Sequence, residues 1–589
     1  MTRYVPPLKD MEFVLRNLAG LDAITRLPGF EECSADLVTS VLDEAGRIAT
    51  DVLAPINQTG DRQGANLQDG TVKTAEGWAA AYKTLVDGNW IGLAAPTEYG
   101  GMGLPGVVNA AVGEMWQAAN MAFTLCPMLT QGAINAIESC ASEALKEQFL
   151  PRLVSGQWAG TMDLTEAAAG SDLGAIRTKA VRNGDYYLIT GQKIFITYGD
   201  HDLTENIIHL VLARTPDAPA GIKGISLFIV PKIALDGETA LAGGNDVQCV
   251  SLEHKLGIHA SPTAVLAYGE KGGAVGYLVG EENHGLEYMF VMMNHARLNV
   301  GLQGLAIAER TYQQARAYAF ERIQGKPIGC PPGTAIVDHP DIRRLLMDMK
   351  AEIEAMRGLA YVAAAALDRT EAETDPAARE EAKRLAELLN PIVKGWCTER
   401  GVEIASMGVQ IHGGMGYAED TGAAQHLRDA RITTIYEGTT AIQANDLINR
   451  KILRDEGKTL RQVLTEVAAL AVDLEQRNDP LLKDIGAALT QAANDAEQAT
   501  AWLLATAGQE PRQAAAAAVP LLLLLGTVLG GHQMARAASL TTGADADFLQ
   551  TKKKTAWHYA ETILPRSSSL LAAVTRGART VMALSPEEL

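Results

Sequence analysis

Apolar side chains recur every three to four residues over most of this chain, which is the spacing of amphipathic helices. The pattern is clear from about residue 30 to 160 and again from about 284 to 450, and alanine and leucine maintain it beyond about residue 458. Residues 36–42 and 301–320 are typical examples. We therefore expect the chain to be mostly helical.

A different pattern interrupts the helices between about residues 161 and 280. Short runs rich in β-branched and aromatic residues predict strands there, and Gly, Asp, Asn and Pro separate the runs as turn residues do. Several short strands in one region favour a small β-sandwich or barrel. The runs are 186–190, 193–197, 207–213 and 225–230.

These changes of pattern predict an α+β fold that is mostly α, with several domains, because 589 residues are too many for one core. We expect an N-terminal helical domain, a middle β domain, a helical domain built as a four-helix bundle, and an additional C-terminal helical domain. Their expected bounds are 1–160, 161–283, 284–457 and 458–589.

One uncharged stretch, residues 514–531, is long enough to be considered as a membrane span. It is rich in alanine, contains Pro520 and three glycines, and continues directly into a segment with His532 and Arg536. We therefore predict a buried bundle helix here and no membrane span.

Charge and cysteine content narrow the class of protein. The net charge of −19 and the pI near 5.1 mean that the molecule as a whole repels phosphate backbones, so general nucleic-acid binding is not expected. The six cysteines form no Cys-x-x-Cys pair and have no histidine at metal-binding spacing, so we predict neither a disulfide framework nor a metal site. The first residues lack the apolar core of a signal peptide, and we expect a cytoplasmic protein.

Glu437 stands among apolar neighbours, two residues after Ile435 and directly before Gly438. A carboxylate in such surroundings is partly desolvated, which raises its pKa toward the range of a general base. The alternative interpretation is a carboxylate at the N-terminus of a helix, because Thr439 and Thr440 could cap the helix that follows. The local sequence alone favours this structural interpretation, since perturbed acids also occur in structural networks.

The segment Met162–Asp172 is rich in Thr, Gly and Ser and leads into the predicted β region. Hydroxyls and exposed backbone N–H groups in such a loop can hydrogen-bond the carbonyls and ring nitrogens of a bound heterocycle. An ordinary turn explains the same composition. No G-x-G-x-x-G fingerprint follows a predicted strand and no G-x-x-x-x-G-K-[ST] loop is present, so neither a Rossmann site nor a P-loop is supported.

Four separated segments, taken in order, resemble the acyl-CoA dehydrogenase family. Their joint occurrence over roughly residues 35 to 455 is far more specific than any one of them. The segments are the glycine-rich loop Pro96–Gly103, the loop Met162–Asp172, the run Lys193–Thr197, and Gln410–Tyr417 continuing to Ile435–Thr439.

The resemblance implies FAD as the cofactor. The loop Met162–Asp172 and the strand with Phe195 would hold the flavin ring, and Arg322 would contact the FAD phosphates across a subunit interface. The segment from Gln410 to Gly414 would belong to the FAD site of a partner subunit, which implies a homodimer or homotetramer. The implied cofactor-binding residues are Met162, Leu164, Thr165, Gly170, Ser171, Phe195, Thr197, Arg322, Gln410, Gly413, Gly414, Thr439 and Ala441.

The resemblance also places Glu437 at the position of the catalytic base, with Ser171, Arg297, Tyr436 and Gly438 at the substrate. It implies that Glu437 removes the pro-R α-proton of an acyl-CoA thioester while the β-hydrogen leaves as hydride to flavin N5, giving a trans-2-enoyl-CoA. Hydrogen bonds from the Glu437 backbone N–H and a flavin ribityl hydroxyl to the thioester carbonyl would stabilise the enolate-like charge. An electron-transferring flavoprotein would then accept the electrons.

Some relatives carry the base on the helix around residue 296, but this chain has Ala296 there and no acid beside it, so the base is expected at Glu437. The chain also departs from the family pattern. Ala167 replaces a proline that many members have, and Arg322 is followed by Ile-Gln-Gly where many have an aromatic residue before the glycine. The flavin contacts around Gln324 are therefore left open.

The long C-terminal region resembles a large bacterial subgroup that includes enzymes acting on 3-methylmercaptopropanoyl-CoA and on fatty acyl-CoAs. The first choice of reaction is oxidation of 3-methylmercaptopropanoyl-CoA to methylthioacryloyl-CoA, a step in dimethylsulfoniopropionate degradation; the alternative substrate is a medium- or long-chain fatty acyl-CoA. An acyl-CoA oxidase would share the base and the flavin. A DNA-associated flavoprotein is a further alternative, although residues 551–589 hold only six Lys/Arg against three Glu.

Overall fold

A computed structural model describes residues 3–236 and 240–589, and the chain separates into two compact units. The helical unit comprises residues 1–46, 105–118 and 297–589, and the sheet unit comprises residues 47–104 and 119–296. Each unit is assembled from segments that lie far apart in the sequence. The four-domain division expected from the sequence stays a prediction.

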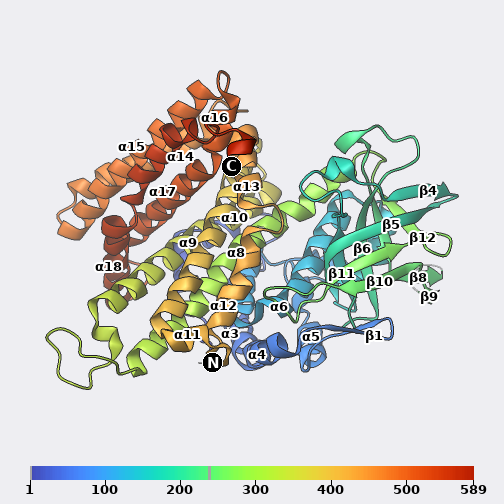
Figure 1. Ribbon diagram of the computed structural model, residues 1–589, viewed down its shortest axis with the longest axis horizontal. Helices are drawn as coiled ribbons and strands as arrows, with labels where there is room; N and C mark the ends of the chain where they lie inside the picture. The colour runs from blue at the N-terminus through green and yellow to red at the C-terminus, as the bar shows by residue number, and fades with distance from the viewer. Residues whose placement is uncertain (1–2, 237–239) are drawn as a thin grey trace. The chain divides into compact units, whose positions relative to one another are not determined.

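The sheet unit contains eight strands that pair into one sheet: β3 (Trp158–Asp163), β4 (Lys179–Asn183), β5 (Tyr186–Thr197), β6 (Asn206–Ala213), β7 (Ser226–Pro231), β10 (Val247–Leu252), β11 (Thr263–Tyr268) and β12 (Ala274–Val279). Their order is β10-β11-β5-β12-β7-β6-β3, with β4 on β5 (Figure 1). β3 and β6 are parallel, and the other pairs are antiparallel. Two short hairpins complete the unit: β1 (Asn66–Gln68) with β2 (Thr71–Lys73), and β8 (Ile233–Asp236) with β9 (Ala240–Gly244).

The pattern of each strand matches its place in this sheet. β6 and β7 are buried along their whole length and are apolar apart from Asn206, His209 and Ser226, which is typical of strands covered on both faces. β5 carries the two runs that the sequence separated, and its side chains Tyr187 and Ile189 pack with Phe228, Val230 and Ala264 in the core of the sheet. The expected middle β domain is confirmed.

The sheet unit also contains helices, and one of them, α6, is interrupted where the chain passes from one unit to the other. They are α4 (Ala54–Gln63), α5 (Trp78–Asp87), α7 (Glu143–Val154) and the second part of α6 (Gly106–Cys140). In α6 the backbone leaves the helical conformation at Asn120, with φ −158° and ψ 88°. The Asn120 side chain accepts a hydrogen bond from the Phe123 N–H (3.1 Å), as a cap would, so the second part begins as a new helix.

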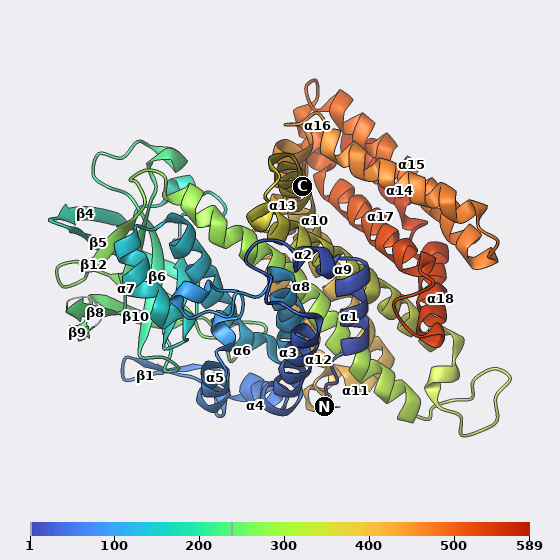
Figure 2. The ribbon, with the colours of Figure 1, turned by 180° about the vertical axis from the view of Figure 1, so that it is seen from behind.

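The helical unit holds most of the other helices, and α8 belongs to it from residue 297 onward. These helices are α1 (Leu8–Asn17), α2 (Leu21–Ile24), α3 (Ala35–Ile48), α8 (Gly285–Glu321), α9 (Pro340–Ala372), α10 (Pro376–His412), α11 (Gly414–Tyr417), α12 (Ala423–Ala430), α13 (Thr440–Asp446), α14 (Lys458–Gln476), α15 (Pro480–Thr506), α16 (Pro511–Ala516), α17 (Ala518–Ser539), α18 (Ala546–Thr562) and α19 (Arg566–Thr575). Within this unit α9 packs on α10, and α14 packs on α15 (Figures 1 and 2). The mostly helical α+β class expected from the sequence is confirmed.

The uncharged stretch 514–531 covers the end of α16 and residues 518–531 of α17. By length and composition α17 could cross a membrane, but 83% of its most apolar window is buried inside the structure. Its glycines allow close packing, because a Cβ at Gly526 would lie 2.2 Å from Cγ of Trp396. α17 contacts α9, α10, α15 and α18, so it is a buried bundle helix, as the sequence predicted.

Candidate active site

Glu437 lies in a turn between the 3₁₀ segment Arg431–Thr434 and α13. Glu437 and Gly438 both have left-handed backbones, with φ of +55° and +92°. A non-glycine residue with positive φ is uncommon and costs about 1 kcal/mol or more, so the surrounding structure must hold it. Thr439 caps α13, since its hydroxyl accepts the Ile442 N–H at 3.3 Å. The turn therefore places Glu437 ahead of the helix.

The Glu437 carboxylate is partly buried and, among the described residues, accepts no hydrogen bond and forms no direct ion pair. Burial raises its pKa, while Arg297 on α8 and Lys394 on α10 oppose the rise. A helix-end carboxylate would accept N–H groups of the first turn. The geometry instead leaves the carboxylate available to accept a proton.

The two cations near Glu437 are held in different ways. Arg297 forms an ion pair with Asp446 at 3.4 Å, and burial lowers its pKa although Asp446 and Glu437 oppose this. Lys394 is fully buried and donates to the Gly438 carbonyl at 2.6 Å. Burial lowers the pKa of Lys394 to about 8, against the effect of Glu437. Both cations favour the ionised form of the glutamate.

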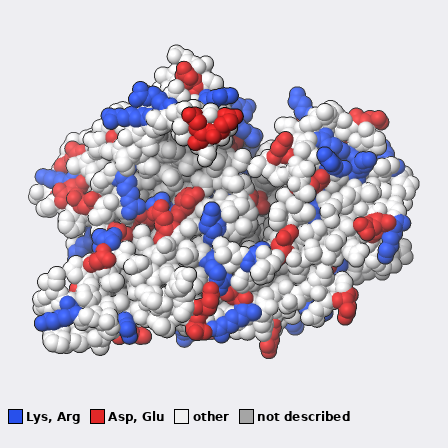
Figure 3. Space-filling view, in the orientation of Figure 1, with Lys and Arg blue, Asp and Glu red and all other residues white. Residues whose placement is uncertain are grey.

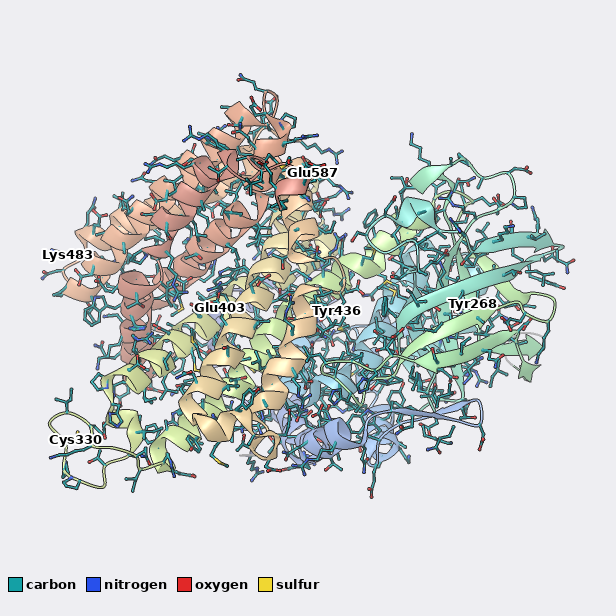
Figure 4. All side chains as sticks on the ribbon, in the orientation of Figure 1. Tyr268, Cys330, Glu403, Tyr436, Lys483 and Glu587 are labelled. Atoms are coloured by element: carbon teal, nitrogen blue, oxygen red, sulfur yellow. The ribbon has the colours of Figure 1, made fainter. Side chains whose placement is uncertain are left out.

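Tyr436 and Gly438 flank the carboxylate. The Tyr436 hydroxyl donates to the Gln303 side-chain oxygen from α8, and burial raises its pKa, so the hydroxyl stays neutral (Figure 4). At Gly438 a Cβ would lie 2.7 Å from Nε2 of Gln443. Glycine suits this position, because a side chain would be strained at this φ and would displace the neighbouring amide.

The segments predicted to bind flavin in the sheet unit are tied together at the ends of β3 and β5. The Ile194 N–H donates to the Thr165 carbonyl at 2.9 Å, and the Thr161 hydroxyl donates to the Thr197 carbonyl at 2.7 Å. These bonds join β3 and the loop after it to the last residues of β5, so the structure brings the two sequence segments into one place.

Lys193 fixes the same loop from within the sheet. Its buried ammonium donates to the Leu164 carbonyl at 3.0 Å and to Glu166 at 2.9 Å. Burial alone would raise the pKa of Glu166, but Lys193 and the Thr178 hydroxyl outweigh it and lower that pKa. A buried lysine paired in this way holds the loop rigidly.

The groups that these segments present fit an isoalloxazine ring. Phe195 is 58% exposed and has φ +58°, so its ring faces outward from β5. Gly170 and Ser171 are exposed, and no atom lies within 4 Å of a Cβ built on Gly170. An exposed aromatic face beside hydroxyl and backbone donors can stack on a flat heterocycle and hydrogen-bond its edge. Met162 and Leu164 add apolar contact.

Replacing Lys193 with Met is expected to loosen this loop and lower the fraction of FAD retained after desalting, because Leu164 and Glu166 lose their buried partner. The ratio of flavin to protein absorbance measures the effect. Lys179→Met, an exposed lysine on β4, is the matched control and should keep its FAD. Equal retention by both variants would show that Lys193 does not support the cofactor.

The remaining predicted FAD residues lie in the helical unit. Arg322, after the last residue of α8, is exposed and donates to the Gln324 side chain at 3.3 Å. Gln410, Gly413, Gly414 and Ala441 are also exposed. The roles of these residues stay predictions. Of the predicted substrate residues, Arg297, Tyr436 and Gly438 lie around Glu437 in the helical unit, whereas Ser171 lies in the sheet unit, and its role also stays a prediction.

The departure at Ala167 has a structural explanation. Glu166 and Ala169 exchange two backbone hydrogen bonds, at 3.1 and 2.9 Å, so a closed turn forms around Ala167 without proline. Among the described residues no group of three or more His, Cys, Asp or Glu side chains could hold a metal ion.

Sequence reasoning missed four residues that shape the two sites: Lys193, Gln303, Lys394 and Gln443. Lys394 did leave a signal, because it is the one charge in the apolar run 391–397 of a helix. A lysine so placed is buried and must have a partner. No comparable signal marks the two glutamines.

Family models cover nearly the whole chain. The N-terminal, middle and C-terminal domains of acyl-CoA dehydrogenase match residues 39–157, 161–268 and 283–452, and an acetyl-CoA dehydrogenase C-terminal-like domain matches residues 457–585.

Full-length relatives agree with these matches. The 3-methylmercaptopropionyl-CoA dehydrogenase of Ruegeria pomeroyi is 48% identical over 97% of this chain and 98% of its own length. The broad-specificity linear acyl-CoA dehydrogenase FadE5 of Mycobacterium tuberculosis is 33% identical over 97% of both chains. A crystal structure of an acyl-CoA dehydrogenase from Bacillus anthracis, complexed with FAD, shares the fold with a TM-score of 0.74, at 20% identity over 96% of this chain and 91% of that one.

A β domain between helical segments of the chain, with a loop that fits a flavin ring and a partly buried glutamate, is typical of a flavin-dependent oxidoreductase. The chain belongs to the acyl-CoA dehydrogenase family, whose members use FAD. This confirms the predicted activity and cofactor over the alternative of a DNA-associated flavoprotein. On the face shown in Figure 3, acidic and basic side chains are interspersed over the C-terminal helices, with no continuous basic band.

Proposed function

We propose that Glu437 is the base that removes the α-proton of the acyl-CoA thioester. The observation that carries this role is a partly buried carboxylate with a raised pKa that accepts no hydrogen bond from the described residues. A base must be free to accept the proton, and a pKa raised by burial strengthens it. Arg297 and Lys394 oppose the rise, because a nearby positive charge favours the carboxylate form.

The backbone of the same turn supplies a donor for the thioester. Among the described residues no carbonyl accepts the Glu437 N–H. An N–H fixed beside the base can hydrogen-bond the thioester oxygen and stabilise the negative charge that develops as the α-proton leaves. When bound, FAD would supply the acceptor for the β-hydrogen, which leaves as hydride.

We propose 3-methylmercaptopropanoyl-CoA as the substrate and methylthioacryloyl-CoA as the product. The support is the Ruegeria pomeroyi relative, which is 48% identical along 98% of its length and is named for this substrate. A linear fatty acyl-CoA is the alternative, because the Mycobacterium tuberculosis relative, named for broad specificity, also aligns along its whole length.

A panel of acyl-CoA substrates separates these two candidates. The short thioether substrate and straight-chain acyl-CoAs of four to sixteen carbons are each assayed with an artificial electron acceptor. We expect the thioether to give the highest kcat/KM, by roughly tenfold or more, since a pocket discriminates by about this factor per misfitted methylene. A higher kcat/KM for a medium- or long-chain substrate would assign the enzyme to fatty acid oxidation.

We propose that the enzyme works as a homodimer or larger and passes its electrons to an electron-transferring flavoprotein. Exposed apolar side chains support an interface around the loop between α8 and α9, which carries Cys330 in Figure 4. In this loop Ile328 is 88% and Ile323 is 54% exposed, and Phe320 near the end of α8 is 54% exposed. Tyr417, the last residue of α11, is 88% exposed as well. Light scattering of the FAD-bound enzyme should give at least twice the 62.7 kDa chain mass. A monomer that retains FAD would contradict the shared site.

We further propose a cytoplasmic location. All six cysteines are free thiols in the structure, which suits a reducing compartment. Cell fractionation followed by immunoblotting tests this location, and recovery of the protein with the membrane or secreted fraction would contradict it.

A further inference from the structure

Lys394 is a buried lysine whose positive charge acts on Glu437. It stands in the middle of α10 between Val393 and Gly395 and has no measurable exposure. Among the described residues it forms no direct ion pair, whereas Arg297 is paired with Asp446. Burying an ammonium ion is costly unless hydrogen bonds and nearby charges compensate. The compensation comes from the Gly438 carbonyl, 2.6 Å away, and from the field of Glu437.

The turn that Lys394 contacts needs to be held. Glu437 and Gly438 both have positive φ, and each presents its carbonyl to a buried donor. Nε2 of Gln443 donates to the Glu437 carbonyl at 3.0 Å, and Lys394 donates to the Gly438 carbonyl. Donors from α13 and α10 thus hydrogen-bond the consecutive carbonyls of Glu437 and Gly438. These bonds hold the strained turn and so fix the direction of the Glu437 side chain and N–H.

The charges around Glu437 and Lys394 come from α8, from α10 and from the turn before α13. Glu437 faces Arg297 from α8 and Lys394 from α10. Lys394 faces Glu437 and Glu399 as favourable charges and Arg297 as an unfavourable one. Asp446 neutralises part of the charge of Arg297. Lys394 has no such carboxylate partner among the described residues, so its positive charge acts on Glu437 without this compensation.

We propose that Lys394 is a positioning residue for Glu437: it holds the turn through the Gly438 carbonyl, and its charge favours the carboxylate form of the base. This inference rests on the proposed role of Glu437. It predicts two separable effects of removing the lysine, one on the rate through geometry and one on the pH profile through charge.

Lys394→Met should show both effects. Loss of the hydrogen bond frees the turn, and we expect kcat to fall roughly 10- to 100-fold with little change in KM. A nearby cation lowers the pKa of a carboxyl group, so its removal raises the pKa of Glu437, and a higher pH is needed to ionise the base. The acidic limb of the kcat/KM profile should therefore move up by about one pH unit.

Two further variants separate geometry from charge. Lys394→Gln is neutral but keeps an N–H donor, so it should move the acidic limb as Lys394→Met does while losing less of the rate. Lys383→Met removes an exposed lysine from the same helix and should change neither quantity. FAD content and melting temperature, measured for each variant, show whether the protein is folded.

An unmoved acidic limb in folded, FAD-bound Lys394→Met and Lys394→Gln would overturn the proposal, whatever happens to the rate. Glu437→Gln, assayed alongside, distinguishes failure of the role of Lys394 from failure of the proposed base. If Glu437→Gln is inactive while Lys394→Met behaves as wild type, only the role of Lys394 falls. If Glu437→Gln turns over normally, the proposed base itself is wrong.

Discussion

Glu437→Gln is expected to lose dehydrogenation almost completely, by roughly 10²- to 10⁴-fold in kcat, while FAD and acyl-CoA still bind. The amide has nearly the same shape as the carboxylate, but it cannot accept the α-proton. It also removes no hydrogen bond, because the Glu437 carboxylate accepts none from the described residues. Anaerobic stopped-flow measurement of flavin bleaching gives the rate, and spectral titration with acyl-CoA gives the dissociation constant.

Glu403→Gln is the matched control. Glu403 lies on α10, the helix that carries Lys394, but it is exposed and pairs with Arg400 at 2.6 Å (Figure 4). Its loss should leave turnover within a few-fold of wild type, because exposed ion pairs contribute little. Near-normal bleaching by Glu437→Gln would move the base elsewhere, and loss of FAD or acyl-CoA binding would show that the carboxylate is needed for binding.

Local patterns were sufficient for the elements around the site. The mostly apolar runs 207–213 and 225–230 form β6 and β7, because strands buried on both faces consist largely of apolar residues. The prediction that a threonine caps the helix after Glu437 is confirmed for Thr439, whose hydroxyl bonds an N–H three residues away. Both features depend on neighbours in the sequence.

Features that depend on contacts between distant parts of the chain could not be predicted from the local sequence. Glu437 and Gly438 have positive φ, and a lysine 44 residues before Gly438 donates to the Gly438 carbonyl. Neither a glutamate nor a lysine indicates a strained turn in the sequence. The break in α6 at Asn120 lies inside an apolar helical pattern that continues on both sides. In each case tertiary contacts hold a backbone conformation that local preference disfavours. The same limit applies to Lys193, whose role depends on a carbonyl on another segment.

Arg357→Met should destabilise the helical unit by about 3–5 kcal/mol, the usual cost of removing one partner from a buried charge cluster. Arg357 on α9 is 1% exposed and donates to Glu114 (2.6 Å), Glu309 (2.8 Å) and Asp10 (2.5 Å), from α6, α8 and α1. Without it, the Tyr361 hydroxyl at 2.7 Å is the one donor that Glu114 keeps among the described residues. Burial already raises the pKa of Glu114 despite Arg357, so the unpaired carboxylate is costly. Urea unfolding followed by circular dichroism measures the loss.

Two controls test whether buried charge is the cause. Arg343→Met, on the same helix, breaks an exposed pair with Asp338 and should cost less than about 1 kcal/mol. Adding Glu114→Gln to Arg357→Met removes the stranded carboxylate and should recover part of the loss, because the two residues are coupled. If Arg357→Met costs no more than Arg343→Met, or if Glu114→Gln only adds to the loss, the cluster does not hold α1, α6, α8 and α9 together.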